Sequence, residues 1–181
     1  SASTEYEIVI VKPGESVTGI EFDPEGGTFT DKRDSRLYHY TSIAGTDWMS
    51  QNMAYCGCGK AFKSTKESGY DAMTDIFGMY YSWNEAQKVC PEGWRLPTEG
   101  DWAALCNSLT DVVPEPYSTY KGISGKFMAN ARLNGERLWA YFPNTKIEPE
   151  ATYINLLPTG FANISGGDYL FDNTQSYAAF W

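Results

Sequence analysis

The sequence has little histidine, a deficit of positive charge and no long hydrophobic run. The 181 residues include one histidine, and 14 basic against 23 acidic side chains give a net charge of −9. A surface that binds nucleic acid needs a basic face, so this charge argues against a nucleic-acid partner. No run approaches the roughly 18 apolar residues that a transmembrane helix needs, so we expect no membrane span.

Cysteine is absent from residues 107–181, and the four cysteines lie upstream at Cys56, Cys58, Cys90 and Cys106. Zinc sites usually take pairs spaced C-x₂₋₄-C, whereas one residue separates the first two here, so we expect no metal site. Structural disulfides, typical of an oxidising compartment, are favoured. A Cys90–Cys106 bridge would clamp the turn between two helices, but four cysteines allow three connectivities and the sequence does not choose.

Catalytic groups are scarce as well. His39 lies in a strand-like stretch without an evident nucleophile or carboxylate partner, and it is interpreted as a half-exposed strand residue. Glycine residues follow no strand–helix pattern of a phosphate-binding loop. We therefore expect no catalytic residue and no cofactor, and the chain is interpreted as a non-enzyme.

The richest local signal is residues 90–102, CPEGWRLPTEGDW. Pro91 and Gly93 end one helix in a turn, and Pro97 keeps the chain extended before the next. Thr98 is a helix N-cap, and Asp101 three residues later completes a capping box. The segment predicts burial of the two tryptophans at its positions 94 and 102.

The order of elements predicts an α+β domain in which two helices pack on a twisted antiparallel sheet with long irregular loops. Residues 1–26 are interpreted as a leader strand or linker after a mature or trimmed start, and residues 27–181 as the domain. We expect the helices near 84–89 and 98–108. Strands are expected at 37–43 and 47–53, a loop over 56–72, a turn at Asn134-Gly135, and antiparallel strands joined near 165–168 towards the end.

Aromatic residues make up 15% of the chain. Large aromatic side chains serve both as core and as binding surface. Trp48, Trp83, Trp94 and Trp102 fall in periodic elements and are assigned to the core. The candidate ligand-binding residues, with packing beneath long loops as the alternative for each, are Tyr117, Tyr120, Trp139, Tyr153 and Tyr169, with Tyr177 in the same pool.

Several of these segments together resemble a known family. They are GTFTDKRD at 27–34, IAGTDWMSQNM at 43–53, FGMYYSWNEA at 77–86, residues 90–102, LPTGF at 157–161 and SYAAFW at 176–181. In order and spacing they are similar to the Fibrobacter succinogenes major paralogous domain, a module of surface and secreted proteins of Bacteroidetes and Fibrobacteres. The resemblance implies a C-type-lectin-like fold, an extracytoplasmic location, and adhesion or binding to a glycan or a surface protein. A lipid anchor on a segment removed ahead of Ser1 stays open.

Two relatives within that fold suggest alternatives. The RLPTE run at 95–99 also resembles the formylglycine-generating, sulfatase-modifying branch, but the thiols that such chemistry needs near the C-terminus are absent. Glu148-Pro149-Glu150 does not match the calcium-binding triplet of sugar-binding lectins. The main hypothesis is a non-enzymatic binding module. The alternatives are an enzyme of the formylglycine-generating-like branch and a purely structural module of a surface assembly.

Overall fold

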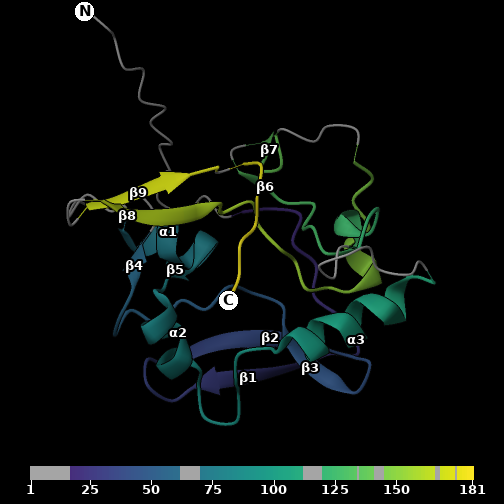
Figure 1. Ribbon diagram of the computed structural model, residues 1–181, viewed down its shortest axis with the longest axis horizontal. Coiled ribbons are helices and arrows are strands. Elements are labelled where there is room, and N and C mark those ends of the chain that lie inside the picture. The colour runs from purple at the N-terminus through teal and green to yellow at the C-terminus, as the bar shows by residue number, and fades with distance from the viewer. Residues whose placement is uncertain are drawn as a thin grey trace, which may run out of the picture.

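The computed structural model describes residues 17–61, 70–111, 120–133, 135–140, 145–165, 168–173 and 175–181. The side chains of residues 70–73, 164, 165, 168 and 169 are outside that description. Within it the chain combines three α-helices with four small antiparallel sheets, so the α+β class is confirmed (Figure 1). None of the described helices is long and apolar enough to cross a membrane.

The largest sheet is an antiparallel meander of β1 (Gly27–Asp31), β2 (Arg36–Ile43) and β3 (Thr46–Met49). Its register pairs Phe29 with Tyr38 and Thr41 with Trp48. On β2, Tyr38 and Thr41 are buried and Leu37 is exposed. Tyr38 and Thr41 are three positions apart and therefore lie on opposite faces of the strand, so each face is covered over part of its length. The expected strand pair over 37–53 is present, with β3 ending earlier than predicted.

Residues 17–26, which the sequence assigned to a leader, contact the rest of the chain. Thr18 forms a two-way backbone bridge with Arg132, with N–O distances of 3.0 and 2.9 Å. Phe22 stacks on His39 with ring centroids 3.8 Å apart. These contacts attach residues 17–26 to β2, which carries His39, and to the backbone of Arg132.

Two helices begin where the sequence predicted. α2 (Trp83–Val89) starts at the N-cap Ser82 with a capping box to Glu85. α3 (Glu99–Leu109) starts at Thr98, whose hydroxyl accepts from the backbone N–H of Asp101 while the Asp101 carboxylate accepts from that of Thr98. Reciprocal capping satisfies backbone donors that have no partner inside the helix, which explains both starts.

The prediction of two helices is wrong, because α1 (Tyr70–Phe77) falls partly in the stretch interpreted as a loop. Gly78 follows it with a φ of +75°, and its N–H donates to Thr74 O at 2.9 Å. A glycine in the left-handed conformation is a common helix end, so the sequence did contain a stop signal. The glycine-, serine- and lysine-rich composition just upstream favoured a loop, and that prediction outweighed the stop signal.

Three further strand pairs are small and separate from the large sheet. They are β4 (Lys60–Ala61) with β5 (Met79–Tyr80), β6 (Arg132–Leu133) with β7 (Glu136–Arg137), and β8 (Phe161–Ser165) with β9 (Asp168–Asp172). Short 3₁₀ turns occupy Ser124–Lys126 and Pro149–Ala151. The predicted single twisted sheet is therefore replaced, in the described part of the chain, by a meander and three two-stranded ladders. The antiparallel pairs β6–β7 and β8–β9 flank the predicted turns at Asn134-Gly135 and 165–168, and Asn134 and residues 166–167 lie outside the described residues.

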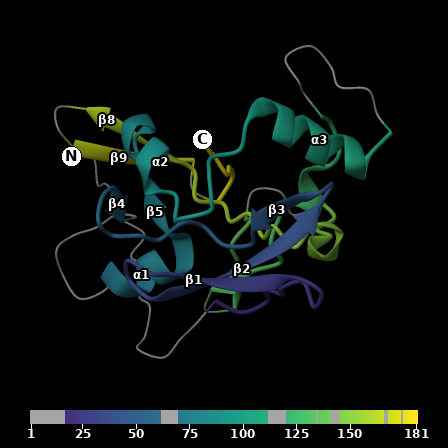
Figure 2. The ribbon, with the colours of Figure 1, turned by 90° about the horizontal axis from the view of Figure 1, so that it is seen from below.

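Two apolar clusters hold these elements together. One joins Leu105 of α3 to Trp48 of β3 and to Phe127, with Trp102 packed at its edge. The other gathers Phe77, Leu133, Leu138 and Leu157 with two buried alanines, and partly buried side chains that include Ile76 of α1 and Phe171 of β9 pack against it. Figure 2 shows α3 beside the end of the meander, and α1 and α2 on the side of β4 and β5.

The tryptophans do not all lie where the sequence put them. Trp48 is buried as predicted. Trp94 and Trp102 are half-buried, not buried: Trp94 stacks on Phe29 at 4.5 Å, and Trp102 leans on Trp48 at 4.9 Å between ring centroids. Trp83 is exposed, so its assignment to the core is wrong.

Candidate functional site

Exposed aromatic side chains gather at the C-terminal end of the chain and at the start of α2. Trp83, Tyr177, Phe180 and Trp181 expose 52%, 57%, 44% and 55% of their surface. We call these four residues the aromatic surface. Large aromatic groups are normally at least partly buried on folding, and these four are the most exposed aromatic side chains among the described residues.

Trp181 is fixed in place despite its exposure. Its indole Nε1–H donates to Tyr81 O at 2.7 Å, across 100 positions of sequence. The Tyr81 hydroxyl in turn donates to Tyr55 O at 2.8 Å. Burial raises the pKa of the Tyr81 phenol well above its usual value, so this hydroxyl stays protonated and remains a donor at neutral pH. Two successive hydrogen bonds therefore connect Trp181 to Tyr81 and Tyr81 to Tyr55.

Trp83 is held by the capped start of α2. Its ring centroid lies 5.5 Å from that of Trp181, with the planes inclined by 56°. Both views place the C-terminal segment near α2 (Figures 1 and 2). The two indoles therefore form an angled pair with open faces, contributed by residues almost a hundred positions apart.

Glu85 fastens this helix start to the neighbouring loop. Its carboxylate accepts from the backbone N–H of Ser82 at 2.8 Å and from that of Gly59 at 3.1 Å. Hydrogen bonds from Ser82, first its backbone and then its side chain, lower the pKa of Glu85. The carboxylate is thus ionised and engaged as a structural acceptor, and it is not poised as a general acid.

Two of the sequence-predicted binding residues have structural roles. Trp139 is buried at 5% exposure, and its Nε1–H donates to Leu156 O at 3.2 Å, so it cannot present a ligand surface. Tyr120 is half-buried against the cluster around Trp48, and its hydroxyl donates to Asn107 Oδ1 at 3.0 Å. The sequence pattern could not separate these rings from surface ones, because packing under loops leaves no periodic signal.

The remaining candidates are Tyr153, Tyr117 and Tyr169. Tyr153 is half-buried with a φ of +52° beside the 3₁₀ turn at Pro149–Ala151. Tyr117 lies outside the described residues, and Tyr169 is described only by its backbone on β9, opposite Ile164. Of the predicted set, the structure therefore places the side chains of Tyr120, Trp139 and Tyr153. Only Tyr177 of the wider pool belongs to the aromatic surface.

The four cysteines are all free thiols, so the predicted Cys90–Cys106 disulfide is not formed. Burial raises the pKa of Cys58, Cys90 and Cys106, which keeps these thiols protonated and poorly nucleophilic near neutral pH. Among the described residues, no group of three histidine, cysteine or carboxylate side chains is placed to hold a metal ion. His39 is half-buried on β2, and its Nδ1 lies 3.1 Å from Gln51 Oε1.

Sequence reasoning missed Trp83, Phe180 and Trp181. The signal available for the last two was their density, since three aromatics fall within residues 176–181. Nothing local distinguished Trp83, because Ser82 and Glu85 predict only that a helix starts there. Its exposure depends on which other segments cover that helix.

Comparison with curated proteins and with solved structures gave no match. A family model, the Fibrobacter succinogenes major domain, matches residues 41–181. This range contains α1, α2, α3 and every residue of the aromatic surface, whereas β1 precedes it. The chain belongs to the Fibrobacter succinogenes major domain family.

Proposed function

We propose that this chain is a non-catalytic, extracytoplasmic binding module of C-type-lectin-like fold that binds glycans through the aromatic surface. The observation that carries the proposal is the exposed pair of Trp83 and Trp181, fixed by the Trp181–Tyr81 hydrogen bond. The mixed α+β architecture is compatible with a lectin-like fold. The extracytoplasmic location rests on the family alone, because free thiols remove the redox argument.

An angled pair of indoles suits a sugar chain. A sugar ring has an apolar C–H face that packs on an aromatic face, and a rigid aromatic group binds with little loss of conformational freedom. Two indoles inclined by 56° present planes of different orientation, which suits consecutive rings of an oligosaccharide. We therefore favour an extended glycan over a single sugar at this surface.

The alternative ligand is a surface protein. Tryptophan and tyrosine are also the preferred anchors of protein interfaces, so exposure alone does not separate the two classes. The chain's net charge of −9 would favour a basic protein partner, whereas a neutral glycan would be indifferent to ionic strength.

A glycan array of the full chain tests the proposal, followed by titration of any hit with Trp83→Ala and Trp181→Ala variants. We expect each variant to lose about tenfold or more in affinity, since stacking on one ring contributes roughly 1–2 kcal/mol. Leu170→Ala removes an exposed apolar side chain of β9, 56% exposed and outside the aromatic surface, and should bind as the unaltered chain does.

Three outcomes would count against the proposal. Binding that survives both tryptophan variants would place the site elsewhere. A protein ligand whose binding weakens with salt and with Trp181→Ala would replace the glycan. Turnover of a cysteine-containing sulfatase peptide to formylglycine by the purified chain would make it an enzyme.

A further inference from the structure

One face of the β8–β9 hairpin is open and carries a further aromatic residue, Phe161, which is 36% exposed. Side chains alternate along a strand, so Phe161 and Asn163 of β8 lie on the same face. Their partners opposite on β9, Asp172 and Leu170, lie on that face too. All four are exposed, whereas the other face of the hairpin turns Phe171 towards the core.

The C-terminal segment extends this open face on the other side of β8. Gly160 and Ala178 form a parallel bridge, and the Gly160 N–H donates to Tyr177 O at 2.7 Å. Paired residues of neighbouring strands point to one side, and the residues next to them point to the other. Gly160 is buried and Ala178 half-buried, whereas Phe161 and Tyr177 are exposed. Phe161 and Tyr177 therefore lie on the same open face, one diagonal step apart, which is within reach of aromatic side chains.

From Tyr177 the chain leads directly to the indole pair. An extended chain covers at most about 14 Å between Tyr177 and Trp181, and Trp181 lies beside Trp83. In Figure 1 the C-terminal segment leaves the layer of β8 and β9 and ends in the direction of α2. Phe161 together with the four residues of the aromatic surface thus forms a continuous strip, which we call the aromatic track. Its two ends are further apart than the two rings of a disaccharide.

The track is built from uncharged sequence, although the chain as a whole carries a net charge of −9. Residues 157–167 and 173–181 contain no acidic, basic or histidine side chain. The acidic residues of the hairpin are on β9, where Asp172 lies opposite Phe161. A strip without charge offers an ionic ligand no attraction, and an ion placed on aromatic rings would lose part of its hydration. The charge pattern therefore favours a neutral ligand.

The polar groups beside the track are neutral carboxamides. Asn84 follows Trp83 on α2, and Asn163 lies two positions after Phe161, and both are exposed. A carboxamide both donates and accepts without charge, as the hydroxyl groups of a sugar do. The Trp181 indole N–H is already used by Tyr81 O. At each end, an open aromatic ring therefore lies close to a group that can bind hydroxyls.

We propose that the aromatic track binds the interior of a linear, uncharged polysaccharide, with some of its sugars packed on Trp83 and Trp181 and others on Phe161 and Tyr177. This inference rests on the glycan-binding function proposed above, and it adds the length and charge of the ligand and the contact at Phe161. A chain that reaches both ends binds the second end as an intramolecular step, which raises its affinity. A disaccharide reaches only one end.

Oligosaccharides of increasing length are the probes. Di-, tri-, tetra- and hexasaccharides of cellulose, xylan, β-mannan and β-1,3-glucan are titrated into the full chain by isothermal titration calorimetry. We expect at least one series to bind, with the hexasaccharide about tenfold or more tighter than the disaccharide. Oligomers of galacturonic acid and of glucosamine, which carry opposite charges, should bind more weakly than this series.

Variants at the two ends of the track should separate long from short ligands. Phe161→Ala and Tyr177→Ala should each lower the affinity for the hexasaccharide about fivefold or more and leave that for the disaccharide unchanged. Trp83→Ala should lower both. Leu170→Ala is the matched control, because Leu170 lies on the same face of the hairpin but on β9, away from the C-terminal segment. It should bind every probe as the unaltered chain does.

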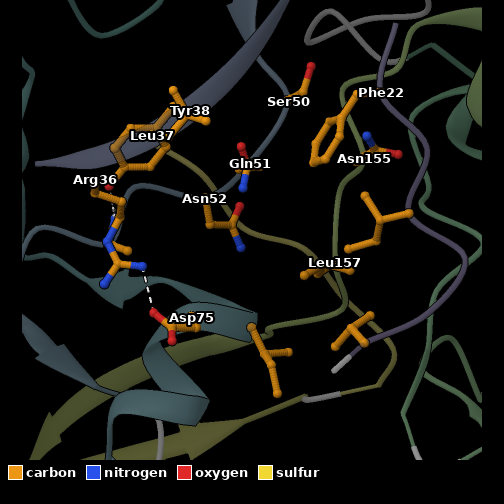
Figure 3. A pocket seen from close by; sticks show the side chains of 14 residues that line it. Phe22, Arg36, Leu37, Tyr38, Ser50, Gln51, Asn52, Asp75, Asn155 and Leu157 are labelled. Atoms are coloured by element: carbon orange, nitrogen blue, oxygen red, sulfur yellow. Dashed lines mark hydrogen bonds and ion pairs between the residues drawn. The ribbon is translucent and has the colours of Figure 1, made fainter. Parts of the chain in front are cut away.

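A cavity of about 510 Å³ elsewhere in the molecule needs its own control. It is bounded by the segment that carries Phe22, by β2, by α1 and by residues 155–157, and it shares no residue with the track (Figure 3). Leu37 lies on its wall and is 52% exposed. Leu37→Trp enlarges a side chain of this wall without changing the core, and it should leave the affinity for the hexasaccharide unchanged.

The inference and the function on which it rests fail in different ways. Equal affinity for the disaccharide and the hexasaccharide would overturn the inference alone. So would hexasaccharide binding that is lost in Trp83→Ala but unchanged in both Phe161→Ala and Tyr177→Ala, because the ligand would then occupy only the indole pair. Tighter binding of a charged oligomer, or loss of binding in Leu37→Trp alone, would also contradict it. Absence of binding by every probe would overturn the inference and count against the glycan function as well.

Discussion

The meander of β1, β2 and β3 and the C-terminal segment from β8 to Trp181 use aromatic residues in opposite ways. In the first, Phe29 of β1 stacks on Tyr38 of β2 and also on Trp94, which comes from the turn after α2. In the second, Tyr177, Phe180 and Trp181 remain open to solvent. The same side chains therefore contribute to stability in one region and are available for binding in the other, and substitutions should separate the two roles.

Paired tryptophan substitutions should give the largest contrast. Trp48→Ala removes a ring buried at 8% exposure against α3 and should reduce the free energy of unfolding by about 3–5 kcal/mol. Trp83→Ala, which removes a ring 52% exposed, should cost less than about 1 kcal/mol. Urea unfolding measures both, and equal losses would mean that the aromatic surface belongs to the core.

Arg33→Ala should have the next largest effect, again on the side of the meander. Arg33 holds the buried carboxylate of Asp31 through two bonds of 2.9 and 2.6 Å, donates to Val89 O at 2.7 Å, and lies over the Tyr55 ring at 4.0 Å. Its removal leaves a carboxylate, 2% exposed, without its partner, which should cost about 3 kcal/mol. Arg36→Ala breaks a more exposed pair and is the control; a comparable loss in urea unfolding would argue against a special role for Arg33.

Lowering the pH should have the smallest effect on the free energy of unfolding. It should act through Asp31 in the meander and through Glu85 in α2, the helix that carries Trp83. The side-chain hydrogen bond from Arg33 lowers the pKa of Asp31, and hydrogen bonds from Ser82 lower that of Glu85. A carboxyl group with a lowered folded pKa contributes its full stability above the usual value near 4 and loses it as the pH falls through the folded value. The free energy of unfolding should therefore be level from pH 7 to about 5 and should fall below about pH 4.

Glu85→Gln provides the matched control for that titration. Its single amide oxygen can accept from the backbone N–H of Ser82 but not also from that of Gly59, which donates to the other carboxylate oxygen, so the variant should be less stable at pH 7. The amide does not titrate, so the acid dependence should become shallower, with Asp31 responsible for what remains. An unchanged pH profile would mean that Glu85 titrates normally in the folded chain.

The elements specified by neighbouring residues were predictable. The capping boxes at Ser82 and Thr98, the turn at Gly135 and the β8–β9 hairpin depend on contacts within a few positions. α1 was missed although Gly78 marks its end, because composition upstream outweighed a single stop signal. The aromatic surface was largely missed for a different reason: Trp83 at a helix start is exposed and Trp139 after β7 is buried, and neither local context indicates which is which.

What the sequence determined by itself was the membership of the chain in its family, the starts of α2 and α3, and the α+β class. These follow from backbone hydrogen bonding and residue pattern, which act over short distances. Only the tertiary structure decided which aromatic rings are open, that Trp83 and Trp181 meet, and that Phe161 and Tyr177 share one open face. The burial of a side chain depends on which segments, distant in sequence, pack against it, and the residues next to it in sequence do not specify those segments.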